Sequence, residues 1–147
     1  MTSLARPTSS DLAVETMIGL ARLATSHPII VAGADSLLLH RELHRRGYLR
    51  CATASGLYVR RGQYCAALIA GDRTHQAIEA SIVSASRFLG ATATIVVAIQ
   101  SDEKGIGLKV RSRLEQLGFR IEAGVRCPSA FLLSAYRCNF ASVGKAA

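Results

Sequence analysis

The stretch that decides the fold of this chain is GIGLKVRSRLEQLGFRIEAGVRCPSAFLLSAYR, residues 105–137. Its first half has the spacing of an amphipathic helix, and Gly118-Phe119 predicts where that helix ends. Two strand-like runs follow, and Cys127-Pro128-Ser129 between them favours a turn. The stretch therefore predicts one helix followed by two strands joined through a tight connection.

Upstream of this stretch, four apolar runs at 28–33, 49–54, 64–70 and 92–99 predict buried strands. Helices are expected over 11–27, 36–46 and 75–90. His27-Pro28 is expected to end the first helix. Asp35 or Ser36 should cap the second, and Gly47 should stop it. Strands that alternate with helices imply a parallel sheet with right-handed crossovers. We expect a three-layer, doubly wound, mostly parallel α/β fold of about six strands with an antiparallel C-terminal hairpin.

The chain has 147 residues, of which 50% are apolar and 19% charged, and this composition suits one domain. We expect a disordered lead over 1–8, the α/β domain over 9–140 and a flexible tail over 141–147. No apolar run approaches the roughly 20 residues of a membrane span. The N-terminus lacks the apolar core of a secretory signal, so we expect a cytoplasmic protein. The four cysteines form no CxxC pair, which favours reduced thiols over a metal or redox site.

Basic residues outnumber acidic ones by 18 to 10, which gives a formal charge of +8. Such a charge attracts polyanions, and the basic residues cluster in two parts of the chain. An aromatic content of 5% argues against base stacking. A solvated helix face, partly paired with Glu42, explains the same charge. His40 and His44 have the spacing of a metal pair but no third ligand nearby, so no metal is expected. The basic clusters comprise Arg41, Arg45, Arg46, Arg50, Arg60 and Arg61, then Lys109, Arg111 and Arg113.

A helix that ends in LEQLGF, followed by a strand pair that finishes in FLLSAYR, resembles the C-terminal end of class I S-adenosylmethionine-dependent methyltransferases. The resemblance covers about residues 28–137. It implies a seven-stranded sheet whose last strand is antiparallel and lies beside the sixth. Only about eight polar residues separate LRCATAS from YCAALIAG, which leaves no room for the third strand of the family and its helix. The resemblance therefore implies a shortened, six-stranded version.

The cofactor motif of that family is an apolar strand with an acid, followed by a GxGxG turn whose glycines admit the cofactor. The matching stretch is IIVAGADSLLL, where Asp35 and Leu37 replace two glycines and Val31 replaces the acid. Ser55 stands where a ribose-binding acid is expected, and Cys65 follows Tyr64 where the family often has an acid. The resemblance implies a degenerate site for S-adenosylmethionine, bordered by Gly33, Ala34, Asp35, Ser55 and Gly71.

In open α/β sheets, ligands bind at the carboxyl ends of the strands. This rule selects the loop that contains Asp72 and His75, which are weak candidates for a general acid and base, with Arg73 as an anion contact. Alternatively, Asp72 and Thr74 cap the next helix while Arg73 and His75 lie in solvent.

Three functional hypotheses follow. The chain is a methyltransferase-like protein with a degenerate cofactor site that binds a small molecule or a protein. Alternatively, it is an active methyltransferase with an atypical cofactor loop, or a basic nucleic-acid-associated protein. A shortened sheet would leave an edge strand and an apolar helix face open, which would suit a homo-oligomer.

Overall fold

A computed structural model describes residues 9–56, 60–100 and 103–138, apart from the side chains of residues 9–12. The expected lead over 1–8 and tail over 141–147 lie outside the described residues. Within them, no helix is long and apolar enough to cross a membrane. The elements in chain order are α1 (Ser9–Ala21), β1 (Ile29–Ala32), α2 (Ser36–Arg45), β2 (Cys51–Thr53), β3 (Tyr64–Ile69), α3 (His75–Ser86), β4 (Leu89–Ile99), α4 (Ile106–Gln116), β5 (Arg120–Arg126) and β6 (Phe131–Cys138).

The six strands form one sheet in the order β2-β1-β3-β4-β6-β5. Strands β1 to β4 run parallel to one another. Strand β6 is antiparallel to both β4 and β5, between which it is inserted. This arrangement confirms the expected α/β fold, including the antiparallel C-terminal hairpin and the six-stranded sheet.

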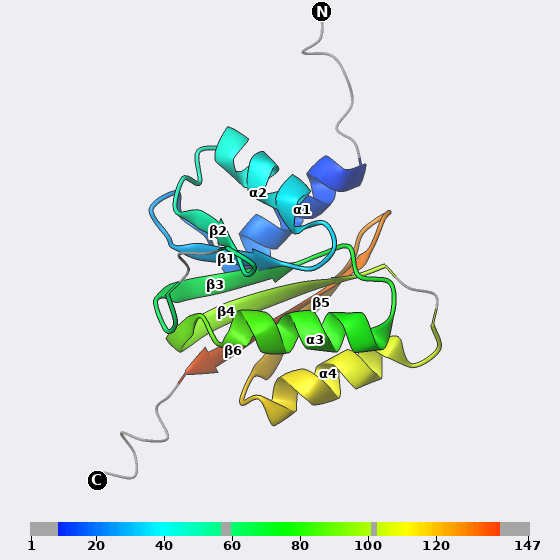
Figure 1. Ribbon diagram of the computed structural model, residues 1–147. Coiled ribbons are helices and arrows are strands. Elements are labelled where there is room, and N and C mark those ends of the chain that lie inside the picture. Colours follow the sequence, from blue (N-terminus) through cyan, green and yellow to red (C-terminus); the bar gives the residue numbers. More distant parts are fainter. Residues whose placement is uncertain (1–8, 57–59, 101–102, 139–147) are drawn as a thin grey trace, which may run out of the picture.

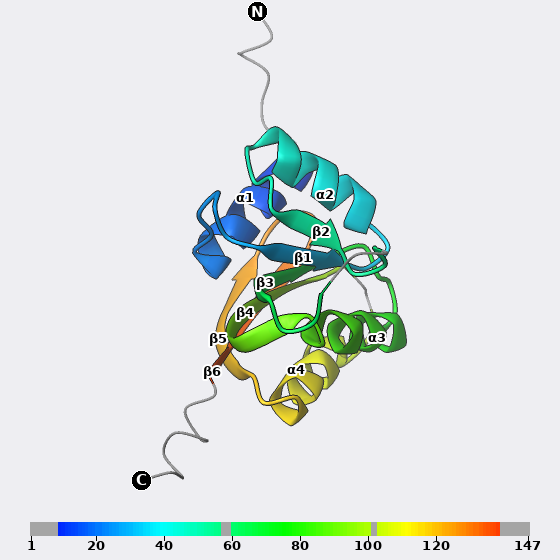
Figure 2. The same cartoon turned by 60° about the vertical axis from the view of Figure 1, so that its left-hand side comes forward.

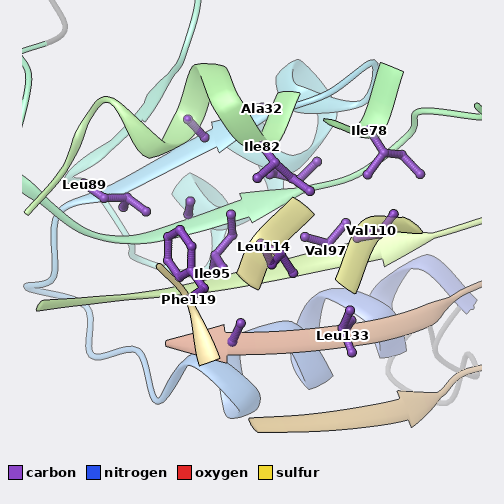
Figure 3. Packing of buried hydrophobic residues seen from close by; sticks show 14 of the residues in the cluster. Ala32, Ile78, Ile82, Leu89, Ile95, Val97, Val110, Leu114, Phe119 and Leu133 are labelled. Carbon is purple, nitrogen blue, oxygen red and sulfur yellow. The ribbon is translucent and has the colours of Figure 1, made fainter. Parts of the chain in front are cut away.

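The helices cover both faces of the sheet, with α1 and α2 on one side and α3 and α4 on the other (Figures 1 and 2). Because successive side chains of a strand point to opposite faces of the sheet, the molecule has one hydrophobic core on each face. Ile30 of β1 packs toward α3 and α4, in the cluster that also contains Ile82 and Val110 (Figure 3). Its neighbour Val31 packs toward α1 and α2 with Met17. Burial on both faces explains why the central strands are continuous apolar runs.

Two helices end earlier than predicted. Helix α1 stops at Ala21 rather than at His27, because Arg22 adopts a left-handed conformation with φ of 52°. The amide of Leu23 donates to Ile18 O at 3.1 Å, and that of Arg22 donates to Gly19 O, which is the Schellman pattern usually built on glycine. Helix α3 stops at Ser86, and β4 begins at Leu89 rather than at residue 92. The predicted stops at Gly47 and Gly118 are confirmed.

Strand β2 lies at the edge of the sheet, as the missing third strand of the family implies. Backbone groups of Arg50 and Ala54 bond to β1, so the carbonyls of Cys51 and Thr53 face outward. Gly56 N donates to Thr53 O at 3.0 Å. His40 Nε2 lies 2.9 Å from Cys51 O, to which it donates. Both outward carbonyls of this short edge strand therefore accept hydrogen bonds from within the chain, so they are not available to a strand of another molecule.

Candidate functional site

The loops that follow β1 and β3 lie against each other at the carboxyl ends of the strands. Asp35 N donates to Ala70 O at 3.0 Å. A Cβ at Gly33 would lie 2.3 Å from Ala70 O, and one at Gly71 would lie 2.4 Å from Asp35 N. Both glycines also have φ of 99°, which disfavours any other residue. These two glycines therefore allow the loops to touch, and they do not leave a space between them.

Asp72 holds the same two loops together. Its side chain is 9% exposed, and both carboxylate oxygens have partners. Ala34 N donates to Oδ1 at 3.1 Å, and Ser81 Oγ of α3 donates to Oδ2 at 2.7 Å. The prediction that Asp72 caps α3 was wrong, because its carboxylate accepts from Ala34 N and from the side chain of Ser81 and not from the first backbone N–H groups of α3. A carboxylate occupied on both oxygens is a structural group in this state.

Thr74 and His75 begin α3. Thr74 Oγ1 accepts from Ala77 N at 3.2 Å, which confirms its predicted capping role. His75 Nδ1 lies 2.7 Å from Glu103 Oε2, so His75 is held by the loop after β4 instead of lying in solvent. The hydrogen bond with His75 lowers the pKa of Glu103. Glu103 precedes α4, which begins at Ile106, and its carboxylate also accepts from His75 N at 3.3 Å. Arg73 is exposed, as expected.

The remaining predicted cofactor position, Ser55, borders a small cavity of about 280 Å³ where β1 and β2 end against α3. Gly33 also lines this cavity, whereas Gly71 does not. Its polar groups are the hydroxyls of Ser36, Ser55, Ser81 and Ser84. The structure therefore brings Gly33 and Ser55 together and places Gly71 behind the β1–α2 loop.

Asp35 faces a different space. It lines a groove of about 380 Å³ between α1 and α2, over the ends of β3 and β4. Gln100, at the end of β4, and Met17 of α1 line the same groove. Sequence reasoning placed Asp35 in the cofactor loop and missed Met17, because the groove forms only when α1 packs beside α2.

These contacts do not fit S-adenosylmethionine as the resemblance places it. A cofactor carboxylate at a glycine-rich turn needs free backbone N–H groups. Here the amides of Ala34, Asp35 and Ser36 donate to Asp72, Ala70 O and Gly33 O respectively. At the end of β2, Ser55 offers a single neutral hydroxyl in place of a carboxylate. The turn that should receive the cofactor is bonded within the chain.

The other polar clusters carry structural contacts. Arg45 and Arg46 both donate to Glu42, and the bond from Arg45 contributes most to lowering the pKa of Glu42. Helices α2 and α4 lie on opposite sides of the sheet, so their basic residues do not form one face (Figure 2). His40 and His44 stack with ring centroids 4.5 Å apart, and the described residues contain no cluster of metal ligands.

All four cysteines are free. Burial raises the pKa of Cys51 to about 12 and that of Cys65 in the same direction. Both thiols therefore behave as small apolar side chains, as predicted.

The sequence matches no protein-family model and no curated protein. Solved structures do match. A SAM-dependent methyltransferase from Aquifex aeolicus has a TM-score of 0.65 at 10% identity, over 84% of this chain and 89% of that one. A release factor-specific protein-(glutamine-N5) methyltransferase from Alicyclobacillus acidocaldarius has a TM-score of 0.57 at 14% identity, over 92% and 95%. Geranyl diphosphate C-methyltransferase from Streptomyces coelicolor has a TM-score of 0.59 at 9% identity, over 87% and 80%. The chain therefore has a class I methyltransferase-like fold.

Proposed function

We propose that this chain, with its class I methyltransferase-like fold, is a binding protein that transfers no methyl group. One observation carries the proposal: Asp72 joins Ala34 N to Ser81 Oγ and holds the β1–α2 loop against the loop after β3. To admit a cofactor at that turn, the chain would have to break these bonds and leave a buried carboxylate without partners. That loss costs about 1–3 kcal/mol for each group left unsatisfied, and more for a charged one.

A second candidate function keeps the cofactor. The small cavity beside Ser36 and Ser55 lies where β1 and β2 end, which is where a ribose would be expected from the resemblance. Hydroxyl groups there support an active methyltransferase with an atypical cofactor loop. Against it, Ser81, which also lines the cavity, is already bonded to Asp72. We rank this candidate second because neutral hydroxyls bind a ribose diol more weakly than a carboxylate does.

Calorimetric titration of the folded chain with S-adenosylmethionine and S-adenosylhomocysteine tests the two candidates. The proposal predicts no binding heat up to millimolar ligand, with folding checked by circular dichroism. A Ser55→Asp variant, which adds an acid at the end of β2, should bind no better, because the loop after β1 stays bonded. Micromolar binding by the wild type would overturn the proposal. Binding by Ser55→Asp alone would mean that the ribose contact, rather than the closed turn, is what the chain lacks.

A further inference from the structure

The parallel strands begin at the end of the sheet that lies opposite the loops described above, and arginines gather there. Arg50 directly precedes β2, Arg87 lies two residues before β4, and Arg120 is the first residue of β5. Strand β6 runs antiparallel to β4 and therefore brings Arg137 to the same end (Figure 1). We call the whole group the strand-start edge, and it comprises Arg22, Arg50, Arg60, Arg61, Arg87, Arg120 and Arg137.

Contacts between these segments join the arginines into a row. Arg50 donates to a backbone carbonyl just before β1, at 3.0 Å. The turn before β3 reaches the start of β4, since a Cβ at Gly90 would lie 3.3 Å from Gly62 O. Arg137 donates to Gly90 O at 3.1 Å, and Arg120 begins the strand that pairs with β6. Neighbouring strands lie about 4.8 Å apart, so the row extends over roughly 24 Å across the six strands.

Few acids balance these charges. Glu122 is bonded to Arg22 at 3.2 Å, Glu42 is held by two further arginines of α2, and Glu115 is exposed in the last turn of α4. Arg50 bonds to a neutral carbonyl, which leaves its charge uncompensated. Four exposed arginines of the edge have no partner in the described part of the chain, namely Arg60, Arg61, Arg87 and Arg120. The strand-start edge is therefore strongly positive.

The type of side chain narrows the kind of ligand. The cations of this edge are all arginines, whereas the described lysines, Lys104 and Lys109, lie toward the opposite end. A guanidinium group presents a planar fork that matches two phosphate oxygens at once. Tyr136 is the one exposed aromatic side chain among the described residues, at 39% exposure, and one ring cannot stack a series of bases. The row therefore suits phosphates along a backbone better than bases.

We infer that the strand-start edge binds the phosphate backbone of double-stranded nucleic acid without reading its bases. A duplex carries about one charge per 1.7 Å of axis, so a row of roughly 24 Å faces about fourteen phosphates. A membrane fits less well, because a lipid-binding surface also inserts an apolar stripe. Leu49 and Tyr136 are the exposed large apolar side chains that the described residues place at this end. The edge lies away from the cofactor turn, so the inference goes beyond the proposed function and does not depend on it.

Fluorescence anisotropy with a labelled DNA duplex and an RNA duplex of the same sequence, each about 20 base pairs long, tests this inference. If about five arginines contact phosphates, the affinity should fall several hundredfold between about 50 and 200 mM salt. A duplex of scrambled sequence should bind equally well, because phosphate contacts carry no sequence information. A single strand of the same length should bind less tightly. The DNA and RNA duplexes together show whether the 2′-hydroxyl contributes.

Two double variants with the same change in charge locate the contact. Arg87→Gln with Arg120→Gln removes two exposed cations of the edge that have no described partner, so the protein should still fold, as circular dichroism can check. Its affinity at low salt should fall about tenfold or more, and the slope of log affinity against log salt should become shallower by about two. Arg73→Gln with Lys104→Gln is the matched control, since it removes two exposed cations from the opposite end. The control should leave that slope unchanged.

No binding of either duplex at about 50 mM salt would overturn the inference. Equal losses in the two double variants would also overturn it, because they would show that only the net charge of the molecule matters. Tighter binding to vesicles of phosphatidylserine and phosphatidylcholine than to the duplexes would assign the edge to a membrane surface instead. Tighter binding to the single strand would replace backbone contacts by base stacking and overturn the inference as stated. The titration with S-adenosylmethionine bears on the proposed function alone.

Discussion

The contact between the loops after β1 and β3 meets the groove between α1 and α2 at Asp35, yet the acids of the two regions are used differently. At the loop contact, Asp72 is almost fully buried, and both of its oxygens are bonded to the chain. In the groove, the Asp35 carboxylate has no partner among the described residues and is only half-buried. Removal of Asp72 should therefore lower the stability of the fold, whereas removal of the Asp35 carboxylate should leave the stability nearly unchanged.

A cofactor motif can be degenerate in two ways: its groups can be left unpaired, or they can be paired within the chain. A motif can lose its function by decay, which leaves unpaired groups and cavities where the ligand used to be. Here the amides of Ala34, Asp35 and Ser36 are all paired within the chain, so the turn has been rebuilt as a packed contact. Of the two buried side-chain atoms without a partner among the described residues, Gln100 Oε1 belongs to a residue that lines the groove, and Ser134 Oγ belongs to β6.

The largest expected effect comes from the contact between the two loops. A Gly33→Ala variant would place a Cβ 2.3 Å from Ala70 O, at a φ of 99°. It should lose roughly 3 kcal/mol or more of unfolding free energy in urea titrations. Gly19→Ala is the matched control, because nothing lies within 4 Å of its added Cβ, and in helix α1 it should stabilise by about 0.5–1 kcal/mol. Wild-type stability in Gly33→Ala would mean that the loops are free to separate.

A smaller effect is expected from Asp72. Asp72→Ala leaves Ala34 N and Ser81 Oγ without their acceptor, so the unfolding free energy should fall by about 2–3 kcal/mol. Asp35→Asn should change it by less than about 0.5 kcal/mol, since its carboxylate bonds to nothing described. Equilibrium urea unfolding of both variants measures the difference. Equal losses at the two positions would remove the distinction between the bonded acid of the loop contact and the unbonded acid of the groove.

The architecture was predictable from sequence because its determinants are local. The periodicity of residues 105–117 and the stop at Gly118 are readable in adjacent residues and led to the correct helix, and the turn at Cys127-Pro128-Ser129 led to the correct hairpin. The end of α1 was not predictable, because a left-handed Arg22 has no sequence mark that distinguishes it from a helical arginine. The final residues of α3 were assigned wrongly for a similar reason: Phe88 and Leu89 suit a helix and a strand equally well.

The candidate site was predictable only as a set of loops. The rule for strand ends selected the segments that contain Asp35, Asp72 and His75, and these do lie at the same edge of the sheet. Their partners were not predictable, since Ala34 is 38 residues from Asp72 and Glu103 is 28 residues from His75. Which acid is bonded and which is unbonded depends on those distant contacts. Local patterns cannot supply that information.

The smallest effect tests whether the loop after β4 is held to the start of α3 in solution, next to the two loops that Asp72 joins. Its Glu103 is bonded to His75, which lowers the pKa of Glu103. A carboxyl whose pKa is lower in the folded chain stabilises the fold above its unfolded pKa, and this contribution disappears as the pH falls through the folded value. In His75→Ala, the pKa of Glu103 followed by carboxyl NMR should therefore rise toward about 4.3. The difference in unfolding free energy between wild type and His75→Ala should be largest near neutral pH and should become smaller in acid. An unchanged Glu103 midpoint would mean that the loop after β4 is not joined to the start of α3 in solution, and that Asp72 alone holds this end of the molecule together.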